Sequence, residues 1–544
     1  MKVFNHQIIV LALFFSFVTF LAKAAHQEIP RLVQKNTATQ LLVDGKPFLM
    51  LGGELGNSSA ASIDELSVIL PKLQKMGLNT ILVPAYWELI EKTEGQFDYS
   101  LTDEVINQAR KYNLKVIFLW FGSWKNSMSC YAPLWIKENT KKYPRAVTKS
   151  GKALEMMSAF SAVNMEVDKL TFAGFMSHLA EYDKAYRTVI MVQVENEIGM
   201  LEDAREYGPI ADERFKADVP ARFMEYLNKN KKNLQPSLLQ KWEANGTKTK
   251  GSWTELFGAG LETDELFMAT VYAEYVQNIT EAGKAKYNLP MYLNAALNSR
   301  GRKPGAYPSA GPLAHLMDVW RFAAPAIDIF APDIYDPGFT DWCKQYHRGG
   351  NPLFIPEIRF EDANAARVFY AFGEHDAMGF SPFSIEDVTD VDNYPLTKSY
   401  ALLHQLEILL AEKQGLDKTN GVLFDNETRE RSIERNGFKF TFKHDNTLGW
   451  SAKAKDGSPW PEAGALIIEL SPTEYIAAGT GIVLSFESLN KNKMAGIGAI
   501  DQIKMENGKM IPLKRLNGDQ THQGRHLRIP VGEWDIQYVK LYEY

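Results

Sequence analysis

Two strongly apolar stretches of the sequence each end in a glutamate. The first is Val189-Ile190-Met191-Val192-Gln193-Val194-Glu195-Asn196-Glu197, and the second is Pro352-Leu353-Phe354-Ile355-Pro356-Glu357. Short apolar runs of this kind are typical of parallel β-strands that are buried on both faces. Glu197 and Glu357 are therefore predicted at the carboxyl ends of two strands, which is where (β/α)8 barrels carry their reactive groups.

Short apolar runs alternate with longer segments of helical periodicity from about residue 41 to residue 410. Eight such runs predict strands at residues 48–53, 80–85, 115–121, 189–196, 290–294, 327–332, 352–356 and 378–383. Helices are expected between them, at residues 63–76, 101–112, 170–182, 262–287, 313–322 and 363–372. Eight strands with intervening helices favour a closed (β/α)8, or TIM, barrel over an open sheet.

The pattern changes after residue 415, where strand-like runs at residues 438–442, 465–469, 481–486 and 534–539 alternate with turns. We therefore predict an α/β protein, with a catalytic (β/α)8 barrel at residues 30–412 and a C-terminal all-β, sandwich-like accessory domain at residues 415–544. Residues 199–260 lack a clear strand and are expected to form a helical insertion at the barrel top. No low-complexity linker separates the two domains, so we expect them to be packed together.

The N-terminus has the features of a secretory signal peptide. Lys2 precedes an apolar stretch at residues 8–21, which is followed by Ala22-Lys23-Ala24. This order predicts a signal peptide at residues 1–24 and an exported protein, periplasmic or extracellular. The alternative is an uncleaved membrane anchor, but the apolar stretch is shorter than the roughly 20 residues that span a bilayer. We expect no membrane contact after cleavage.

The composition is that of an ordinary globular protein, with 45% hydrophobic and 23% charged residues. A net charge of −6 gives no electrostatic reason to expect binding to nucleic acid or to an anionic membrane. The sequence has no HExxH, Cys-x-x-Cys, P-loop or Gly-x-Ser-x-Gly motif, so neither a metal nor another cofactor is expected. An acidic run at residues 386–392 could hold calcium, but a solvated loop is the simpler interpretation. Cys130 and Cys343 could form a bridge in an oxidising compartment or remain two free thiols.

The two glutamates match the needs of glycoside cleavage. That reaction requires one protonated carboxyl to donate to the leaving oxygen and one ionised carboxylate to attack the anomeric carbon. Because side chains alternate along a strand, Glu195 is expected to point to the same side as Glu197. Glu197 is the outermost residue of its run and is therefore the better candidate for the acid/base, with Glu357 as its partner. The alternative is that these glutamates are solvated residues at strand ends, but their occurrence on two different strands argues against it.

Other side chains at predicted barrel-top positions are candidates for contact with a sugar. Asn196 can hydrogen-bond a sugar hydroxyl next to the reacting carbon. Tyr335 ends the strand Ala331-Pro332-Asp333-Ile334-Tyr335, and its hydroxyl can bond Glu357 and help to keep that carboxylate ionised. Trp87 and Trp124 follow the second and third strands and can stack on sugar rings, although a core role is the alternative for each.

Three blocks of the sequence occur together in one enzyme family. They are Gln193-Val194-Glu195-Asn196-Glu197-Ile198-Gly199, Phe354-Ile355-Pro356-Glu357, and a second-strand region with Gly77-Leu78-Asn79-Thr80, Trp87-Glu88 and Glu94-Gly95-Gln96-Phe97-Asp98-Tyr99. This set resembles glycoside hydrolase family 35, the retaining β-galactosidases of a large clan of (β/α)8 glycosidases. The resemblance covers about residues 41–410, and residues 498–541 resemble an accessory β domain of some bacterial members. It implies that Glu197 is the acid/base and Glu357 the nucleophile of a double displacement with retention, with carboxyls about 5 to 5.5 Å apart.

Two segments differ from the better-known members of that family. Those members carry Asn-x-His-Glu-Pro after the second strand, where this sequence has Glu88-Leu89-Ile90-Glu91-Lys92. Their Ser-Gly-x-x-His-Tyr block after the first strand is replaced here by Gly52-Gly53-Glu54-Leu55-Gly56-Asn57. The differences concern the galactose contacts and indicate a divergent bacterial branch that acts on galactose side chains of plant polysaccharide. Glu54, Asn57 and Glu91 are the candidates for selecting the sugar.

These features predict an exported retaining exo-β-galactosidase that removes terminal β-linked galactose from an oligo- or polysaccharide. One alternative is an exo-β-glycosidase of the same clan that removes another sugar, such as glucose or arabinose. A second is a non-catalytic carbohydrate-binding protein on a barrel that has lost its activity. The presence of both Glu197 and Glu357 argues against the second, because binding alone does not need two carboxylates. The sequence does not indicate the oligomeric state.

Overall fold

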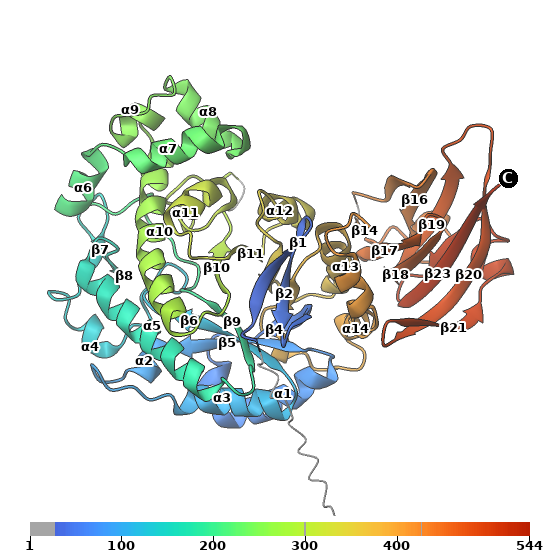
Figure 1. Cartoon of the computed structure of the whole chain (residues 1–544), viewed down its shortest axis with the longest axis horizontal. Coiled ribbons are helices and arrows are strands. Elements are labelled where there is room, and N and C mark those ends of the chain that lie inside the picture. The colour runs from blue at the N-terminus through green and yellow to red at the C-terminus, as the bar shows by residue number, and fades with distance from the viewer. Residues whose placement is uncertain (1–27, 299–300, 426) are drawn as a thin grey trace, which may run out of the picture.

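The computed structural model of the protein describes residues 28–298, 301–425 and 427–544. It consists of a (β/α)8 barrel followed by a C-terminal β domain, as the sequence predicted (Figure 1). The predicted signal peptide lies outside the described residues. Within those residues, no helix has the length and apolar character needed to cross a membrane.

Eight parallel strands, almost entirely buried, close the barrel. In barrel order they are β4 (Met50–Glu54), β5 (Thr80–Tyr86), β6 (Lys115–Phe121), β9 (Val189–Gln193), β10 (Met291–Ala296), β11 (Ile329–Ile334), β12 (Phe354–Ile358) and β13 (Gly379–Pro382). All eight coincide with predicted runs, whose aliphatic and aromatic residues suit strands buried on both faces. The fourth strand ends at Gln193 rather than at residue 196, because Glu195 and Glu197 have left-handed φ angles of 60° and 46°.

Helices alternate with these strands and cover the outside of the barrel (Figure 1). The six predicted helices are present as α1 (Ile63–Lys75), α3 (Ser100–Lys111), α5 (Ala162–Tyr182), α10 (Leu261–Lys286), α11 (Met317–Ala323) and α13 (Asn364–His375). The structure adds α2 (Trp87–Ile90), α4 (Leu134–Lys137), α12 (Phe339–Tyr346) and α14 (Pro395–Lys413). Helix α5 begins at Ala162 rather than at residue 170, because the Ser161 side chain accepts the backbone N–H of Asn164 at 3.2 Å and so caps the helix there.

The predicted helical insertion is confirmed between residues 199 and 260. It contains α6 (Pro209–Lys216), α7 (Ala221–Asn230), α8 (Pro236–Ala244) and α9 (Trp253–Phe257), which gather at the upper left of Figure 1 near the start of α10. The apolar face of α7 holds the insertion against the barrel, since the Phe223 ring lies 4.9 Å from the ring of Phe322 in α11.

Two small antiparallel sheets are additions that the sequence analysis did not predict. One joins β1 (Arg31–Lys35), β2 (Ala38–Val43) and β3 (Lys46–Pro47), and the other joins β7 (Arg145–Val147) and β8 (Ala153–Met157). The first sheet is fixed to the end of α14, where the Gln40 side chain donates to the backbone oxygen of Ala411 at 2.7 Å. The second lies in the connection between β6 and α5.

The C-terminal domain is built from two antiparallel sheets, which confirms the predicted β domain. The larger sheet contains β14 (Thr419–Phe424), β17 (Ala463–Ser471), β18 (Glu474–Thr480), β23 (Asp535–Glu543), β20 (Ala495–Glu506) and β21 (Lys509–Arg515) in spatial order. The smaller contains β15 (Glu430–Arg435), β16 (Phe438–His444), β19 (Ile482–Ser488) and β22 (Leu527–Ile529). Apolar side chains from both sheets form one core between them.

The inner strands β17 and β18 of the larger sheet are buried on both faces. Ala465 and Ile467 of β17 belong to the core between the two sheets, whereas Leu466 and Ile468 belong to the core of the barrel domain. Alternate side chains of one strand therefore enter two different cores. Helices α13 and α14 lie between the barrel and this sheet in Figure 1, so the two domains are packed together.

Close backbone contact joins α13 to the larger sheet. A Cβ atom added at Gly464 would lie 2.3 Å from the backbone oxygen of Ala366 and 2.8 Å from its carbonyl carbon. Beside this contact, the Arg367 guanidinium donates two hydrogen bonds, of 2.9 and 2.6 Å, to the Glu462 carboxylate. Paired hydrogen bonds of this kind fix orientation as well as distance.

We predict that Gly464→Ala lowers the free energy of unfolding by about 1 to 3 kcal/mol, because the new methyl group forces the sheet away from α13. Urea denaturation followed by circular dichroism measures the change. The matched control is Gly498→Ala in the same sheet, where the added Cβ lies 3.5 Å from its nearest neighbour. Equal stability of the two variants would contradict this account of the interface.

Candidate active site

Four buried carboxyl side chains meet at the carboxyl ends of the barrel strands. Glu54 ends β4, Glu197 follows β9, Asp333 lies in β11 and Glu357 lies in β12, with exposed fractions of 1%, 6%, 1% and 5%. Oxygen atoms of Glu197, Asp333 and Glu357 all lie within 4.8 Å of one another. The structure thus brings together the two glutamates selected from the sequence, and we call these four residues the carboxylate cluster.

Glu357 is held by a hydrogen bond from the Tyr335 hydroxyl to its Oε1 atom, as the sequence analysis expected. Burial and the neighbouring charge of Glu197 raise the pKa of Glu357 to about 7. The ammonium group of Lys125 and hydrogen bonds from Tyr335 and Glu54 act in the opposite direction, because each favours the ionised carboxylate. Its Oε2 atom has no hydrogen-bond partner within the described part of the chain.

Glu197 is held through both its side chain and its backbone. The Asn126 amide donates to its Oε2 atom, and its backbone N–H donates to Asn294 Oδ1 at 2.9 Å. The Asn294 amide in turn donates to Asp333 Oδ2 at 2.7 Å, which joins three barrel strands at the site. The sequence analysis missed these three partners. Asn294 and Asp333 lie at the ends of predicted strands, and that position could have identified them, whereas Asn126 lies in a loop that carries no such signal.

Glu54 and Asp333 are surrounded by other carboxyl groups. Burial, and next the charge of Glu357, raise the pKa of each well above its usual range. Both are therefore shifted toward the protonated form, in which a carboxyl can donate one hydrogen bond. Lys125, which is 6% exposed, lowers the pKa of Glu54 as well as that of Glu357 and supplies the nearby positive charge. Lys125 is a further member of the site that the sequence analysis missed.

Several polar atoms at the site are buried without a hydrogen-bond partner among the described residues. Both side-chain amide atoms of Asn196 are of this kind, as are Asn57 Oδ1, Glu54 Oε1 and Asp333 Oδ1. Buried polar groups are nearly always hydrogen-bonded in folded proteins. A ligand rich in hydroxyl groups could satisfy them, and the roles of Asn196, Asn57 and Glu54 as sugar contacts stay predictions.

Glu195 does not point to the same side as Glu197, so that expectation is wrong. Glu195 accepts the backbone N–H of Trp124 at 2.7 Å and is hydrogen-bonded to the buried Asp168. Asp168 also accepts from the Trp120 indole at 3.0 Å. The left-handed backbone at Glu195 and Glu197 ends the strand alternation and directs the two carboxyls into separate surroundings.

Residues 40–264 match the family described as glycosyl hydrolases family 35. This match covers less than half of the chain, from β2 to the start of α10. Residues 396–528 match a domain of unknown function (DUF5597), which begins within α14 and covers most of the C-terminal β domain. No curated protein matches the chain. The matched family is the one that the sequence blocks resemble.

Distant similarity to solved structures accompanies this match. The β-galactosidase of the psychrophilic Marinomonas ef1 is 14% identical, with a TM-score of 0.45, over 68% of this chain and 61% of that one. The β-galactosidase of Bacillus circulans sp. alkalophilus is 15% identical, with a TM-score of 0.45, over 68% of this chain and 57% of that one. The catalytic domain of β-amylase from Paenibacillus polymyxa is 15% identical, with a TM-score of 0.41, over 63% of this chain and 94% of that one. The chain thus spans less than two thirds of the length of these two β-galactosidases.

Three predicted sugar contacts are buried in the barrel domain. Trp124 is fully buried, with its ring edge-on to Tyr275 at 4.7 Å. The Trp87 indole and the Thr171 hydroxyl donate to Glu91 Oε2 at 3.0 and 2.7 Å, and the Gly95 N–H donates to Glu91 Oε1 at 2.8 Å. The core role that was the alternative for Trp87 and Trp124 fits both, and the Glu91 carboxylate is occupied by these three donors.

The remaining sequence alternatives are resolved by local contacts. Cys130 is exposed and Cys343 is buried, and both are free thiols. In the acidic run, Glu386 accepts the backbone N–H of Gly56 at 2.8 Å, so it serves a loop contact rather than a calcium site. Among the described residues, only Glu197, Asp333 and Glu357 form an acidic group of suitable geometry for a cation. Two of them, Glu197 and Glu357, are the carboxyls that the sequence analysis selected for glycoside cleavage.

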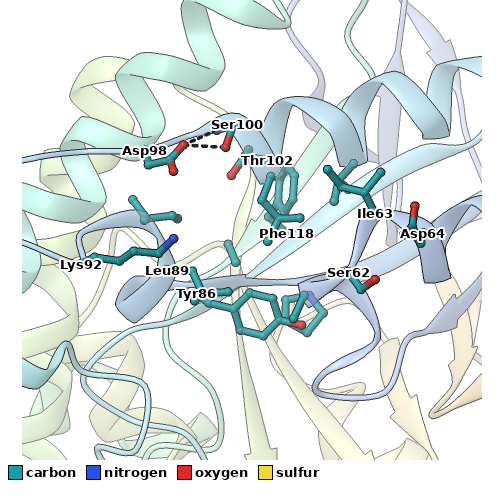
Figure 2. A pocket seen from close by; sticks show the side chains of 16 residues that line it. Ser62, Ile63, Asp64, Tyr86, Leu89, Lys92, Asp98, Ser100, Thr102 and Phe118 are labelled. Carbon is teal, nitrogen blue, oxygen red and sulfur yellow. Dashed lines mark hydrogen bonds between the residues drawn. The ribbon is translucent and has the colours of Figure 1, made fainter.

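A cavity of about 520 Å³ lies outside the barrel wall, between α1, α3 and β5. Figure 2 shows the side chains of Tyr86 and Phe118 at this cavity, with Lys92 and Asp98 at one side and Asp64 at the other. No member of the carboxylate cluster lines it. We therefore separate this cavity from the candidate active site.

We predict that Tyr335→Phe raises the titration midpoint of Glu357 by about one pH unit or more, because the ionised carboxylate loses a hydrogen bond. Carbon NMR of protein labelled at its glutamate carboxyls measures the midpoint, and the spectrum of Glu357→Gln assigns the signal. Tyr186→Phe, which alters an exposed tyrosine, is the control. An unchanged or lower midpoint in Tyr335→Phe would refute the stabilising role of this hydroxyl.

Proposed function

We propose that this protein is an exported, retaining exo-β-galactosidase. The observation that carries the proposal is the approach of Glu197 and Glu357 oxygens to within 4.8 Å at the top of a family 35 barrel. Retaining glycosidases have carboxyls about 5 to 5.5 Å apart, whereas inverting enzymes need roughly 6.5 to 9.5 Å to admit a water molecule. The short separation therefore favours retention.

Two displacements give the reaction. In the first, Glu357 attacks the anomeric carbon while Glu197 gives its proton to the leaving oxygen, so the glycosidic bond breaks and a glycosyl ester forms. In the second, Glu197 takes a proton from water, and the resulting hydroxide attacks the same carbon and releases Glu357. The configuration at that carbon is inverted twice and hence retained.

The surrounding residues support these roles. Tyr335 and Lys125 favour the ionised form of Glu357, which is the form that attacks. Asn126 and Asn294 fix the orientation of Glu197. Glu54 donates to Glu357, and the unpartnered oxygens of Glu54 and Asp333 can accept from sugar hydroxyls. Asn196 can bind the hydroxyl beside the reacting carbon.

Galactose is the sugar that the family match favours. Glu54 and Asn57 remain candidates for selecting its axial 4-hydroxyl, since both have buried oxygens without a partner among the described residues. Polysaccharide side chains as substrate and export to the periplasm or outside the cell rest on the sequence features alone. An exo-β-glycosidase for another sugar keeps the same two glutamates and is the alternative that a substrate panel separates.

We predict that Glu357→Ala abolishes hydrolysis of every substrate, because the nucleophile is needed in both displacements. Glu197→Ala should still react with nitrophenyl substrates, whose good leaving group needs no proton, and should regain turnover with azide. Nitrophenol release at several azide concentrations measures both effects. The control is Glu533→Ala, an exposed glutamate of the β domain. Retained turnover in Glu357→Ala would assign the nucleophile to another residue.

We predict that kcat/KM for nitrophenyl β-galactoside exceeds that for the glucoside by at least about tenfold, which corresponds to roughly 1.4 kcal/mol. The two sugars differ at the 4-hydroxyl, and the wrong epimer leaves buried polar groups unpaired. Asn57→Ala should lower this ratio if Asn57 contacts that hydroxyl. Equal rates on the two epimers would instead favour the alternative exo-β-glycosidase.

A further inference from the structure

A cavity of about 440 Å³ lies apart from the carboxylate cluster, between the β7–β8 hairpin, the start of α5 and the start of α6. A hydrogen bond of 2.8 Å from the Tyr207 backbone N–H to the Val147 backbone oxygen joins two of its walls. The hairpin and α6 occupy the left edge of the molecule in Figure 1. No cluster carboxyl lines this cavity.

Two buried polar side chains, Glu206 and Arg145, line this cavity and do not hydrogen-bond each other. Glu206 is 5% exposed, its Oε1 atom accepts the Ser158 hydroxyl at 2.5 Å, and the Ala159 backbone N–H also favours its ionised form. Its Oε2 atom has no hydrogen bond of good geometry among the described residues. Arg145 Nη1 is likewise buried and unpartnered, although Nη2 donates to the Lys137 backbone oxygen at 3.3 Å. Such groups are rare in folded proteins unless a ligand or water meets them.

The two groups differ in what they can offer a ligand. Burial raises the pKa of Glu206 to about 8, so its side chain is a neutral acid at pH 7 that can donate one hydrogen bond and accept others. Arg145 can only donate, and it keeps its charge, which the Glu155 carboxylate partly balances at 3.3 Å. A ligand that bridges them must therefore carry acceptors at both ends, and uncharged hydroxyl groups meet this need.

The other walls of the cavity are mainly apolar. Phe160 and Tyr207 contribute aromatic rings, and Pro209 and Ile210 contribute aliphatic surface at the start of α6. A mainly apolar cavity with a few convergent polar groups is typical of small-molecule sites, whose volumes begin at roughly 300 Å³. A pyranose ring has this same combination, with C–H faces that pack on apolar side chains and hydroxyls at its rim.

The cavity and the carboxylate cluster are built from the same two chain segments. Glu206 lies in the loop that also carries Glu197, and Arg145 and Ser158 lie in the connection between β6 and α5 that also carries Asn126. Both sites therefore lie on loops that follow the carboxyl ends of β6 and β9. We propose that this cavity is a second saccharide-binding site, which holds an uncharged pyranose unit between Glu206 and Arg145; the proposal rests on the proposed glycosidase function.

The test compares a long and a short substrate in the full-length chain. Arg145→Met and Glu206→Leu remove one polar group each and keep most of the side-chain volume. The ratio of kcat/KM for β-1,4-galactotetraose to that for nitrophenyl β-galactoside should fall at least about tenfold in both variants. Glu206→Gln, which can still donate and accept, should keep most of the ratio. Arg222→Met, which removes an exposed arginine that is paired with Glu274 outside the cavity, should leave it unchanged.

Calorimetric binding of galactotetraose to chains that also carry Glu357→Ala provides a readout without turnover. Arg145→Met in this background should weaken binding at least about tenfold relative to Arg222→Met. Equal affinity of these two chains, or an unchanged kinetic ratio, would overturn the second site while leaving the proposed hydrolysis intact. A wild-type chain that hydrolyses neither substrate would refute the proposed function, and the calorimetric comparison would still decide whether the cavity binds saccharide.

Discussion

The left-handed backbone at Glu195 and Glu197 is the constraint on which the site depends. A left-handed conformation costs roughly 1 to 2 kcal/mol for a residue other than glycine, so surrounding contacts must hold it. Those contacts are buried, since Glu195 binds the Trp124 backbone and Asp168 on one side of the loop. On the other side, the Glu197 backbone binds Asn294. If the strand continued regularly past Gln193, the side chains of Glu195 and Glu197 would point to the same face of the strand. The two carboxyls would then share one environment.

In the carboxylate cluster, burial and neighbouring charges shift the pKa values of chemically similar groups by different amounts. Four carboxyls and one lysine lie close together in the cluster. Ionising all four carboxyls would place several negative charges side by side in a buried site, where water cannot screen them. Burial and the charge of Glu357 raise the pKa of Glu54 and of Asp333, which favours the protonated form of both. Contacts with Tyr335 and Lys125 favour the ionised form of Glu357 instead. Under the proposed mechanism, Glu54 then serves as a hydrogen-bond donor to the nucleophile.

Sequence reasoning succeeded where position along a strand determines position in space. The eight apolar runs gave the barrel, and the rule for strand ends gave Glu197, Glu357 and Tyr335. Sequence reasoning failed where the conformation of a loop sets the direction in which a side chain points. Lys125 and Asn126 reach the cluster from a loop in which Asn126 has a φ of 50°, and no periodicity predicts such a turn. Trp87 likewise has the expected position in the chain, yet its side chain enters the core.

Two elements that the sequence analysis did not predict, the small N-terminal sheet and α14, have recognisable signals in the local sequence. Asp44-Gly45 separates β2 from β3 and is a typical hairpin turn, so the small N-terminal sheet was accessible to sequence analysis. Pro395 at the first position of α14 is a comparable start signal. The buried hydrogen bond between Glu195 and Asp168 has no such signal in the sequence. The two residues lie in different segments of the barrel, and only the folded loop brings them together.

The position of α13 gives the C-terminal domain an influence on the chemistry that its distance from the cluster would not suggest. This helix directly follows β12, the strand that carries Glu357, and its other side rests on the larger sheet through Gly464 and the Arg367–Glu462 pair. The sheet therefore supports, through α13, the strand that carries Glu357. Under the proposed mechanism, a change in the β domain that shifts α13 would also shift the position of the nucleophile.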